Sequence, residues 1–345
     1  MRKVLAVLLV VLVALAIHLR LAKPDPDGPS GAPPAGARLE TEDGIAVLRL
    51  AGPPRAKGRA HGVAMADRIR RELERVRPAD PGLREVAIET CGDRLLPFVP
   101  TALRAELEGL AEGAGITLAE AFFLNARFEL ASFLLAEGDL RPADLLGEAA
   151  VGPGPEVRRR FATGRLVDGP TTLVVTVHED RDPPLVLVGL PGMIGGFAGL
   201  RGEIAGALCP VAGQVSPVLN GLVWPLLLRC LLEEPPAPGG ALPAKATLGA
   251  SIPLRAAGDR VGTLNVTPAG AAWYSGRKFA ATMEEVGPVD SPAAVERAGA
   301  ILAMEERAQR LLQDRDRDPG IHLSGARDGF SVAVGNRRAR IRYGE

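Results

Sequence analysis

The chain has 345 residues with 41 basic and 41 acidic side chains, so its formal net charge at pH 7 is zero. Its 47% hydrophobic and 24% charged residues are typical of a globular protein with a packed core, which excludes global disorder. The neutral charge balance and an aromatic content of 4% argue against nucleic acid as a partner. Three cysteines without CxxC spacing and four scattered histidines predict no disulfide framework, no metal site and no cofactor.

The N-terminal segment, residues 1–22, begins with two basic residues at positions 2 and 3, followed by an unbroken apolar run from Val4 to Ile17. This pattern is typical of an export signal, and the apolar run is shorter than the roughly 20 residues that span a bilayer. Two alternatives remain: a membrane anchor extended by snorkelling basic residues, or a signal peptide cleaved near Ala14–Ala16. Both place the folded part outside the cytoplasm, either anchored to the membrane or secreted.

The next segment, residues 23–43, is rich in proline, glycine and aspartate and predicts a flexible linker, which leaves 44–345 as one folded domain. Alternation of apolar residues over 44–50 predicts that this domain begins with a strand. Apolar residues at three- and four-residue spacing then predict a helix over 57–76.

Two more helices are expected after this one. The first, over 101–112, should end at the glycines that follow it. The second starts at Thr117, which forms a capping box with Glu120 because each side chain can satisfy a free amide of the first turn.

Strands dominate the rest of the chain. We expect a loop over 140–157 and then a hairpin of two strands, 171–178 and 185–188. The further expected elements are, in chain order, a glycine-rich tight turn over 192–202, a strand over 203–209, a helix over 219–232 interrupted by Pro225, strands over 250–254 and 262–267, a helix from Ser291, and a final hairpin over 329–343 that turns at Gly335–Asn336. Grouped helices and antiparallel hairpins predict an α+β layered domain rather than an alternating parallel-sheet fold.

Two segments carry the most informative motif. The first is G-R-A-H-G over 58–62, at the start of a predicted helix. The second is E-G-L-A-E-G-A-G over 108–115, followed by L-N-A-R-F-E over 124–129. Together they resemble the penicillin acyltransferase-like family, which comprises autoproteolytic cysteine amidases and acyltransferases of the N-terminal-nucleophile hydrolase superfamily. The similarity covers about 44–345 and is specific over 55–130.

This resemblance implies a four-layer αββα sandwich, in which two antiparallel sheets lie between helical layers. It also implies self-cleavage before a cysteine, whose thiol and free α-amine then attack a small amide or acyl substrate. The chemistry is plausible at working pH because an α-amine titrates near neutrality and can take the thiol proton.

The sequence departs from the family at the nucleophile itself. No cysteine lies between Cys91 and Cys209, and if Gly147 matches the glycine before the nucleophile, Glu148 occupies the nucleophile position. A carboxylate cannot perform the N-to-S acyl shift that cleaves the precursor. We therefore expect Glu148 to lie in a cleft near Asp168, with its ionisation disfavoured by burial or by that neighbouring charge.

Two further family positions are altered. The downstream Arg-Asn-x-Asp motif keeps its arginine and Asp168 but has Leu166 in place of asparagine. Met283 stands where the family has an asparagine that stabilises the oxyanion. Loss of a nucleophile typically costs about 10³ to 10⁶ in rate, and loss of an oxyanion donor roughly another 10² to 10³.

The candidate site residues are His61, Asn125, Arg127, Glu129, Glu148 and Asp168. The first four have both a catalytic and a structural interpretation. His61 is either a general base or a partner of a backbone carbonyl. Asn125 and Glu129, four residues apart, share a helix face that Arg127 does not. These three residues either line the site or anchor their helix through buried hydrogen bonds, and we favour the second alternative.

Two functions remain open. The first is a non-catalytic relative that binds or scaffolds a small amide or acyl ligand, an envelope component or a catalytic paralogue. The second is an active acyltransferase or amide hydrolase with a rerouted nucleophile, either Glu148 or Thr171, the latter exposed as a new N-terminus by cleavage.

Overall fold

The computed structural model describes residues 36–134, 148–152, 154–160, 173–210, 221–235, 250–256, 260–267, 270–276, 280–281, 306, 309–312 and 320–343. Within this part of the chain, the strands form a ten-stranded and a six-stranded sheet. The larger sheet has the order β1 (Ala37–Glu42), β2 (Ile45–Leu50), β5 (Val174–His178), β6 (Leu185–Gly189), β7 (Ala198–Arg201), β8 (Ile204–Ala207), β10 (Ala250–Ala256), β11 (Arg260–Thr267) and β12 (Gly270–Gly276), with β9 (Cys209–Pro210) also paired to β10. The smaller sheet has the order β13 (Ala280–Ala281), β3 (Glu148–Val151), β4 (Glu156–Arg160), β14 (Gly320–Ala326), β15 (Gly329–Val334) and β16 (Arg337–Arg342).

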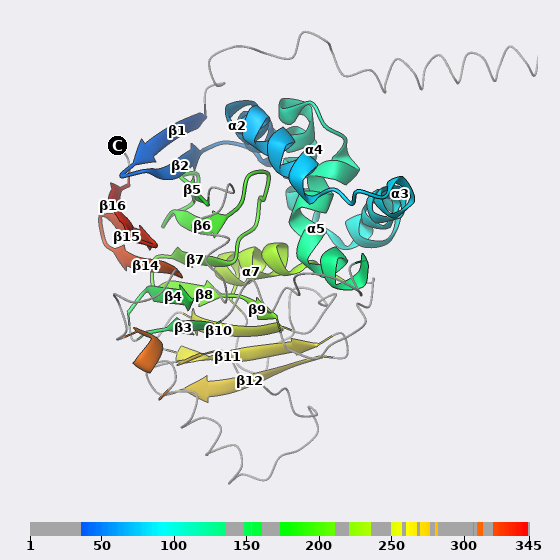
Figure 1. Cartoon of the computed structure of the whole chain (residues 1–345). Helices are drawn as coiled ribbons and strands as arrows, with labels where there is room; N and C mark the ends of the chain where they lie inside the picture. The colour runs from blue at the N-terminus through cyan, green and yellow to red at the C-terminus, as the bar shows by residue number, and fades with distance from the viewer. Residues whose placement is uncertain are drawn as a thin grey trace, which may run out of the picture.

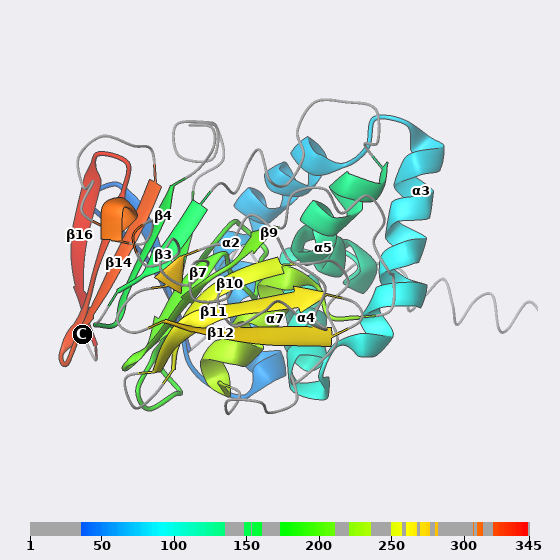
Figure 2. The same ribbon diagram turned by 90° about the horizontal axis from the view of Figure 1, so that it is seen from below.

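The two sheets stack face to face, and helices cover the other face of the larger sheet (Figures 1 and 2). Strands β3 and β4 lie against β7 and β8, whereas α7 (Trp224–Glu233) packs on β6, β7 and β8 from the opposite side. The remaining helices are α2 (Pro54–Val76), α3 (Pro81–Glu89), α4 (Thr101–Ala114) and α5 (Leu118–Leu134), with a π-helical turn η1 (Thr90–Leu95) and a 3₁₀ turn η2 (Leu96–Phe98). The predicted α+β class is thus confirmed.

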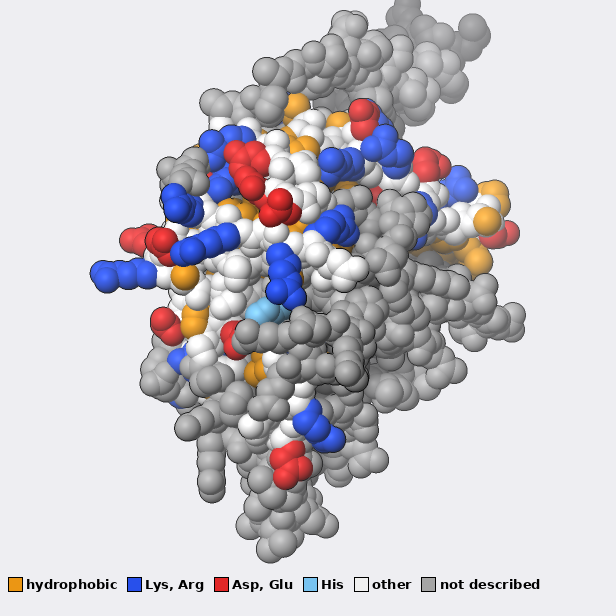
Figure 3. All heavy atoms as spheres, turned by 60° about the vertical axis from the view of Figure 1, so that its left-hand side comes forward, with side chains coloured by type: hydrophobic (Ala, Val, Ile, Leu, Met, Phe, Trp, Pro, Cys, Tyr) orange, Lys and Arg blue, Asp and Glu red, His pale blue; other side chains and the backbone are white. Residues whose placement is uncertain are grey.

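The central strands of the larger sheet are covered on both sides. Every residue of β2, β5 and β6 is buried, which explains why their sequences are nearly continuous apolar runs. Strand β16 lies at the edge of the smaller sheet, and its exposed residues Arg338, Arg340 and Arg342 alternate with buried Ala339 and Ile341. Seen from this side of the molecule, basic and acidic side chains are interspersed (Figure 3), in agreement with the neutral charge balance.

Several local predictions are confirmed. The strand over 44–50, the hairpin β5–β6 and the final hairpin with its turn at Gly335 form as expected. Helix α4 extends two residues further than predicted and ends at Gly115, whose φ of 68° is left-handed. The capping box also forms: the Thr117 N–H donates to Glu120 Oε2 over 2.8 Å, and the Glu120 N–H donates to Thr117 Oγ1 over 3.2 Å.

Other predictions are corrected. The loop expected over 140–157 is wrong for its described residues, which start at Glu148, because β3 and β4 form a hairpin there. Pro225 does not interrupt a helix but lies in the first turn of α7, where a missing N–H leaves no hydrogen bond unmade. Residues 37–42, assigned to the linker, form β1, which pairs with β2 through a turn at Asp43–Gly44 with φ angles of 48° and 77°. The Asp-Gly pair, typical of a two-residue hairpin turn, could have revealed it.

The described residues leave some predictions unexamined. Residues 1–35 lie outside them, as do Leu166, Asp168, Thr171, Met283 and the start of the helix expected from Ser291. Residues 309–312 are helical, with Leu311 and Leu312 buried. The second helical layer of an αββα sandwich therefore stays a prediction.

Helices α2 and α4 make the closest contact in the helical layer, and glycines make it possible. A Cβ atom at Gly58 would lie 1.8 Å from the backbone oxygen of Glu106, and one at Gly62, Gly109 or Gly113 would lie 2.0 to 2.4 Å from a backbone oxygen of the facing helix. The two G-x-x-x-G pairs interlock, so the helix backbones touch. The glycines of the family-like motif thus have a packing role.

Substitution of Gly113 by alanine should therefore destabilise the fold, because its Cβ would meet backbone rather than a flexible side chain. We expect Gly113→Ala to lower the free energy of unfolding by at least about 2 kcal/mol in urea denaturation. Gly92→Ala is the control, since a Cβ there would meet only the Ala119 Cβ, at 4.0 Å. Equal stabilities of the two variants would contradict the interlocked packing.

Candidate functional site

The three motif residues of α5 are all buried inside the protein. The exposed fraction is 0% for Asn125, 6% for Arg127 and 0% for Glu129. Asn125 and Glu129 point to the loop after β6 and to the start of α7, whereas Arg127 points to α2. The predicted sharing of one face by Asn125 and Glu129 is therefore confirmed.

Asn125 holds the glycine-rich loop between β6 and β7. Its Nδ2 atom donates to the backbone oxygen of Gly192 over 3.0 Å, and its Oδ1 atom accepts from the N–H of Ile194 over 2.9 Å. A second Nδ2 bond of 3.0 Å goes to the oxygen of Ala121 in the same helix. Gly192 has a φ of 81°, a left-handed conformation that strains any residue with a side chain, and a Cβ there would lie 2.6 Å from Leu124 Cδ1, so the Leu124 side chain would have to move.

Arg127 forms a buried ion pair with Glu72 of α2. Arg75 also donates two hydrogen bonds to this carboxylate, over 2.7 and 3.0 Å. Burial would raise the pKa of Glu72, but the hydrogen bonds from Arg75 and the charge of Arg127 hold it below its usual value. Burial lowers the pKa of Arg127 to about 10, so Arg127 remains charged at neutral pH. This ion pair ties α5 to α2.

Glu129 caps the first turn of α7. Its Oε1 atom accepts a hydrogen bond from the backbone N–H of Trp224. Burial raises the pKa of Glu129 to about 8, although this hydrogen bond acts in the opposite direction. Cys91 of η1 lies near Glu129, and burial followed by the charge of Glu129 raises the pKa of its thiol above the ordinary range. Cys91 is thus a protonated core thiol.

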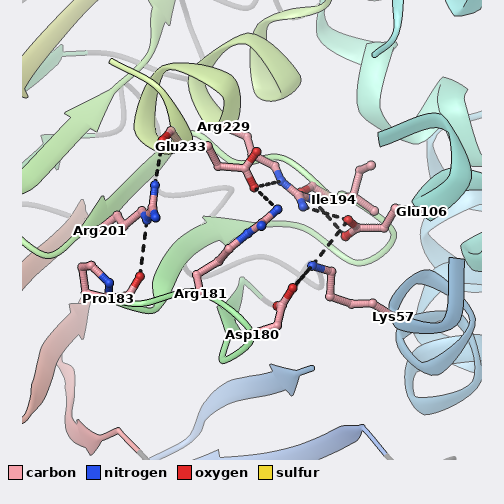
Figure 4. A network of polar contacts seen from close by, with 9 residues as sticks. All are labelled: Lys57, Glu106, Asp180, Arg181, Pro183, Ile194, Arg201, Arg229 and Glu233. Atoms are coloured by element: carbon pink, nitrogen blue, oxygen red, sulfur yellow. Dashed lines mark hydrogen bonds and ion pairs between the residues drawn. The ribbon is translucent and has the colours of Figure 1, made fainter. Parts of the chain in front are cut away.

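A second group of buried polar residues connects α2, α4, α7 and the turn between β5 and β6 (Figure 4). Arg229 of α7 donates to both carboxylate oxygens of Glu106 over 2.9 and 2.7 Å and to the backbone oxygen of Ile194 over 2.7 Å. Lys57 of α2 donates to Asp180 over 3.0 Å and lies 4.0 Å from Glu106. The exposed fraction is 1% for each of Lys57, Glu106 and Arg229.

His61 lies in this group, with a second histidine beside it. His61 is 1% exposed and His178, the last residue of β5, is 0% exposed. Burial first, and then the charge of Arg229, lowers the pKa of His61 to about 4, so it is neutral at pH 7. Neither ring nitrogen of either histidine has a hydrogen-bond partner among the described residues. The contact of His61 with a backbone carbonyl, one of the two interpretations from the sequence, is thus not found among the described residues.

The other predicted site residues are placed in part or not at all. Glu148 is the first residue of β3, where it pairs with Arg160 of β4, and its side chain is outside the described part. Because Asp168 and Thr171 are also outside it, the predicted cleft shared by Glu148 and Asp168 stays a prediction. The apolar run around Cys230 in α7 predicts a buried thiol, but Cys230 is only partly buried, and this burial raises the pKa of its thiol to about 11.

Sequence reasoning missed four members of the buried polar group: Lys57, Glu106, His178 and Arg229. One signal could have found them. Arg229 interrupts the apolar run L-L-L-R-C-L-L, and a charged residue within a buried helix requires a partner. The four-residue spacing of Lys57 and His61 places both on one face of α2.

The polar groups of the site are bonded mainly to other groups of the protein. The charged groups named above are paired with each other, and the described residues include no group of three His, Cys, Asp or Glu side chains that could hold a metal ion. None of the helices in this part of the chain combines the length and the apolar character needed to cross a membrane. Comparison of the sequence with models of protein families and with curated proteins finds no match.

The role of Asn125 can be tested by Asn125→Asp, which removes both Nδ2 donors and directs carboxylate oxygens at backbone oxygens. We expect the free energy of unfolding, from urea denaturation, to fall by about 2 to 4 kcal/mol. Asn336→Asp, at the exposed turn before β16, is the control and should change it by less than about 0.5 kcal/mol. Similar effects at both positions would contradict the conclusion that Asn125 holds the loop between β6 and β7.

The raised pKa of Glu129 predicts a pH dependence of stability. Between about pH 4.5 and 8 the Glu129 carboxyl is ionised in the unfolded chain but keeps its proton in the folded protein. The contribution of Glu129 to the free energy of unfolding is therefore complete below pH 4.5 and is lost as the pH rises through 8. Glu129→Gln should keep an oxygen that accepts from the Trp224 N–H, and because glutamine does not titrate, its contribution should not fall as the pH rises. Its stability relative to wild type should therefore increase with pH, by up to roughly 4 kcal/mol over the range.

Urea denaturation at pH 5, 6.5 and 8 measures this difference, and pH effects of other groups cancel between the two proteins. Glu74→Gln, at an exposed position of α2, is the control and should follow the wild type. Parallel profiles for Glu129→Gln and wild type would show that Glu129 is ionised in the folded state.

Proposed function

We propose that this protein is a non-catalytic relative of the amide hydrolases and acyltransferases of the N-terminal-nucleophile superfamily. It retains their αββα scaffold outside the cytoplasm and binds or scaffolds a partner, which is a small amide or acyl ligand, an envelope component or a catalytic paralogue. Its N-terminal apolar segment directs export and, if it is not removed, anchors the protein to the membrane.

The observation that carries this proposal is the use of the α5 motif for internal contacts. A catalytic role would require at least one of Asn125, Arg127 and Glu129 to reach a substrate. Each is buried and bonded to another part of the scaffold: the loop at 192–194, Glu72 and the start of α7. The motif therefore supports a structural function, because losing such residues would leave buried polar groups unpaired.

The chemistry of the neighbouring groups supports the same conclusion. His61, the candidate base, is buried and has no carboxylate to orient it among the described hydrogen bonds. The thiols of Cys91 and Cys230 are protonated at neutral pH, since burial raises the pKa of both. Glu148 begins a strand of the sheet that faces the larger one, which agrees with the nucleophile position assigned from the resemblance.

Mass spectrometry of the purified chain tests the proposal, because members of the family cleave themselves. We expect one chain with no break before Glu148 or Thr171, and no adduct after incubation with an activated acyl ester or amide. Two fragments that begin at either residue, or a stoichiometric acyl adduct on one of them, would favour the active alternative with a rerouted nucleophile and overturn the proposal.

A gain-of-function variant tests the resemblance itself. Glu148→Cys places a thiol at the proposed nucleophile position, where the scaffold should promote the N-to-S acyl shift. We expect slow cleavage before residue 148, accelerated by hydroxylamine, which attacks the thioester intermediate. Glu156→Cys in the neighbouring strand is the control and should stay intact. Identical behaviour of the two variants would contradict the assignment of position 148.

A further inference from the structure

The turn between β5 and β6, residues 179–184, is held to the helical layer mainly by charged contacts. Asp180 accepts from Lys57 of α2 over 3.0 Å, and Arg181 lies 3.4 Å from Glu233 of α7. Arg201 links the same two regions, because it donates to the backbone oxygens of Pro183 and of Glu233 over 3.4 and 2.7 Å (Figure 4). These contacts depend on the charge state of their surroundings.

The ion-paired charges of this network balance only while the histidines are neutral. The cations in these ion pairs are Lys57, Arg181 and Arg229, and the anions are Glu106, Asp180 and Glu233. Arg201 adds a further positive charge, and its hydrogen bonds go to backbone oxygens. The anions are therefore already paired with cations. Protonation of His61 and His178 would add two positive charges, with no additional anion among these residues to balance them.

The surroundings of the histidines oppose protonation from every side. His178 faces His61 and Lys57 from α2, Arg229 from α7 and Arg181 from the turn itself. On α4, Glu106 is held by Arg229 and Lys57. On β2, the charged neighbour of the turn is Arg49, which is paired with Glu179 over 2.9 Å.

The histidines also contribute no hydrogen bond among the described residues that would explain their presence. All four of their ring nitrogens are buried and lack a partner there. A buried polar group without a partner costs stability, and an apolar residue of similar size would pack equally well at neutral pH. At these two positions, an imidazole therefore has an advantage over an apolar side chain only under conditions in which it binds a proton.

We propose that His61 and His178 form an acid-sensitive latch, which releases the turn at 179–184 from α2 and α7 as the pH falls below about 6.5. Release exposes the imidazoles to water, where they bind protons with their ordinary affinity. The closed form excludes those protons because burial and the surrounding cations lower the pKa of both side chains. Acid therefore favours the open form, while the remainder of the sandwich stays folded.

The expected size follows from proton linkage. A histidine that is freed on opening, with a pKa near 6.5, favours the open form about 25-fold more at pH 5 than at pH 7. Two histidines freed together give roughly 600-fold. If the protein lies outside the cytoplasm, as proposed above, it is exposed directly to such changes in the pH of its surroundings.

Hydrogen exchange of the full chain at pH 7 and pH 5, corrected for the intrinsic pH dependence of exchange, measures the opening. Within 178–185, Pro183 and Pro184 have no amide hydrogen, the Glu179 N–H is hydrogen bonded to the Leu50 oxygen over 2.8 Å, and His178 and Leu185 are paired strand residues. We expect protection of the amides of His178, Glu179 and Leu185 to fall by roughly 600-fold at pH 5, while amides of β15 and β16 in the other sheet retain theirs. An equal loss in both regions would indicate global unfolding, and no loss at 178–185 would indicate no latch. Either result would overturn the proposal.

Variants identify the groups responsible. His61→Leu and His178→Leu should each reduce the pH-dependent loss at 178–185 about 25-fold, and the double variant should show almost none. His61→Gln with His178→Gln is the alternative pair if the apolar variants fold poorly, because glutamine is polar but does not titrate. Conversion of His322, which binds Glu156 in the smaller sheet over 2.6 Å, to Gln is the control. An unchanged loss in both double variants would assign the pH response to other groups and overturn the proposal.

Discussion

Backbone contact between α2 and α4 is the constraint on which the helical layer depends. The interlocked glycines bring the two helices closer than side chains would allow, and this places Lys57 of α2 4.0 Å from Glu106 of α4. Arg229 from α7 then completes the group by binding Glu106 with both nitrogens of its fork. The glycine pairs of α2 and α4 thus determine the position of the buried charges.

These charges join parts of the chain that are far apart in the sequence. Arg229 contacts the backbone oxygen of Ile194, whose N–H binds Asn125, so one loop is held from α7 and α5 together. Buried ion pairs rarely add stability compared with apolar packing, but breaking one leaves an unpaired charge. The network therefore fixes which helices may pack against the loop rather than strengthening the core in general.

Local sequence patterns predicted α2, α4 and the start of α5, because a capping box and a terminal glycine act within one turn. They did not predict α3 or the π-helical turn after it. They failed where partners are distant. Strand β4 reads E-V-R-R-R, yet Arg158 and Arg159 are buried, and Arg159 extends between the sheets to the backbone oxygen of Phe197 over 3.3 Å. In the site, the shared face of Asn125 and Glu129 was predictable from their spacing. Their partners at 192–194 and 224 were not, since tertiary packing brings these segments together.

The parallel pairing of β2 with β5 also limits how the molecule can assemble. Residues 51–173 separate these strands and include most of the helical layer and the β3–β4 hairpin. Pairing between strands so far apart in the sequence forms slowly, because a long loop must close, at a cost in entropy, before any contact between the strands stabilises it. Until then the hairpin β1–β2 has an open edge that can pair with strands of other chains. The rate at which β2 pairs with β5 therefore controls the competition between productive folding and aggregation when the chain is newly made.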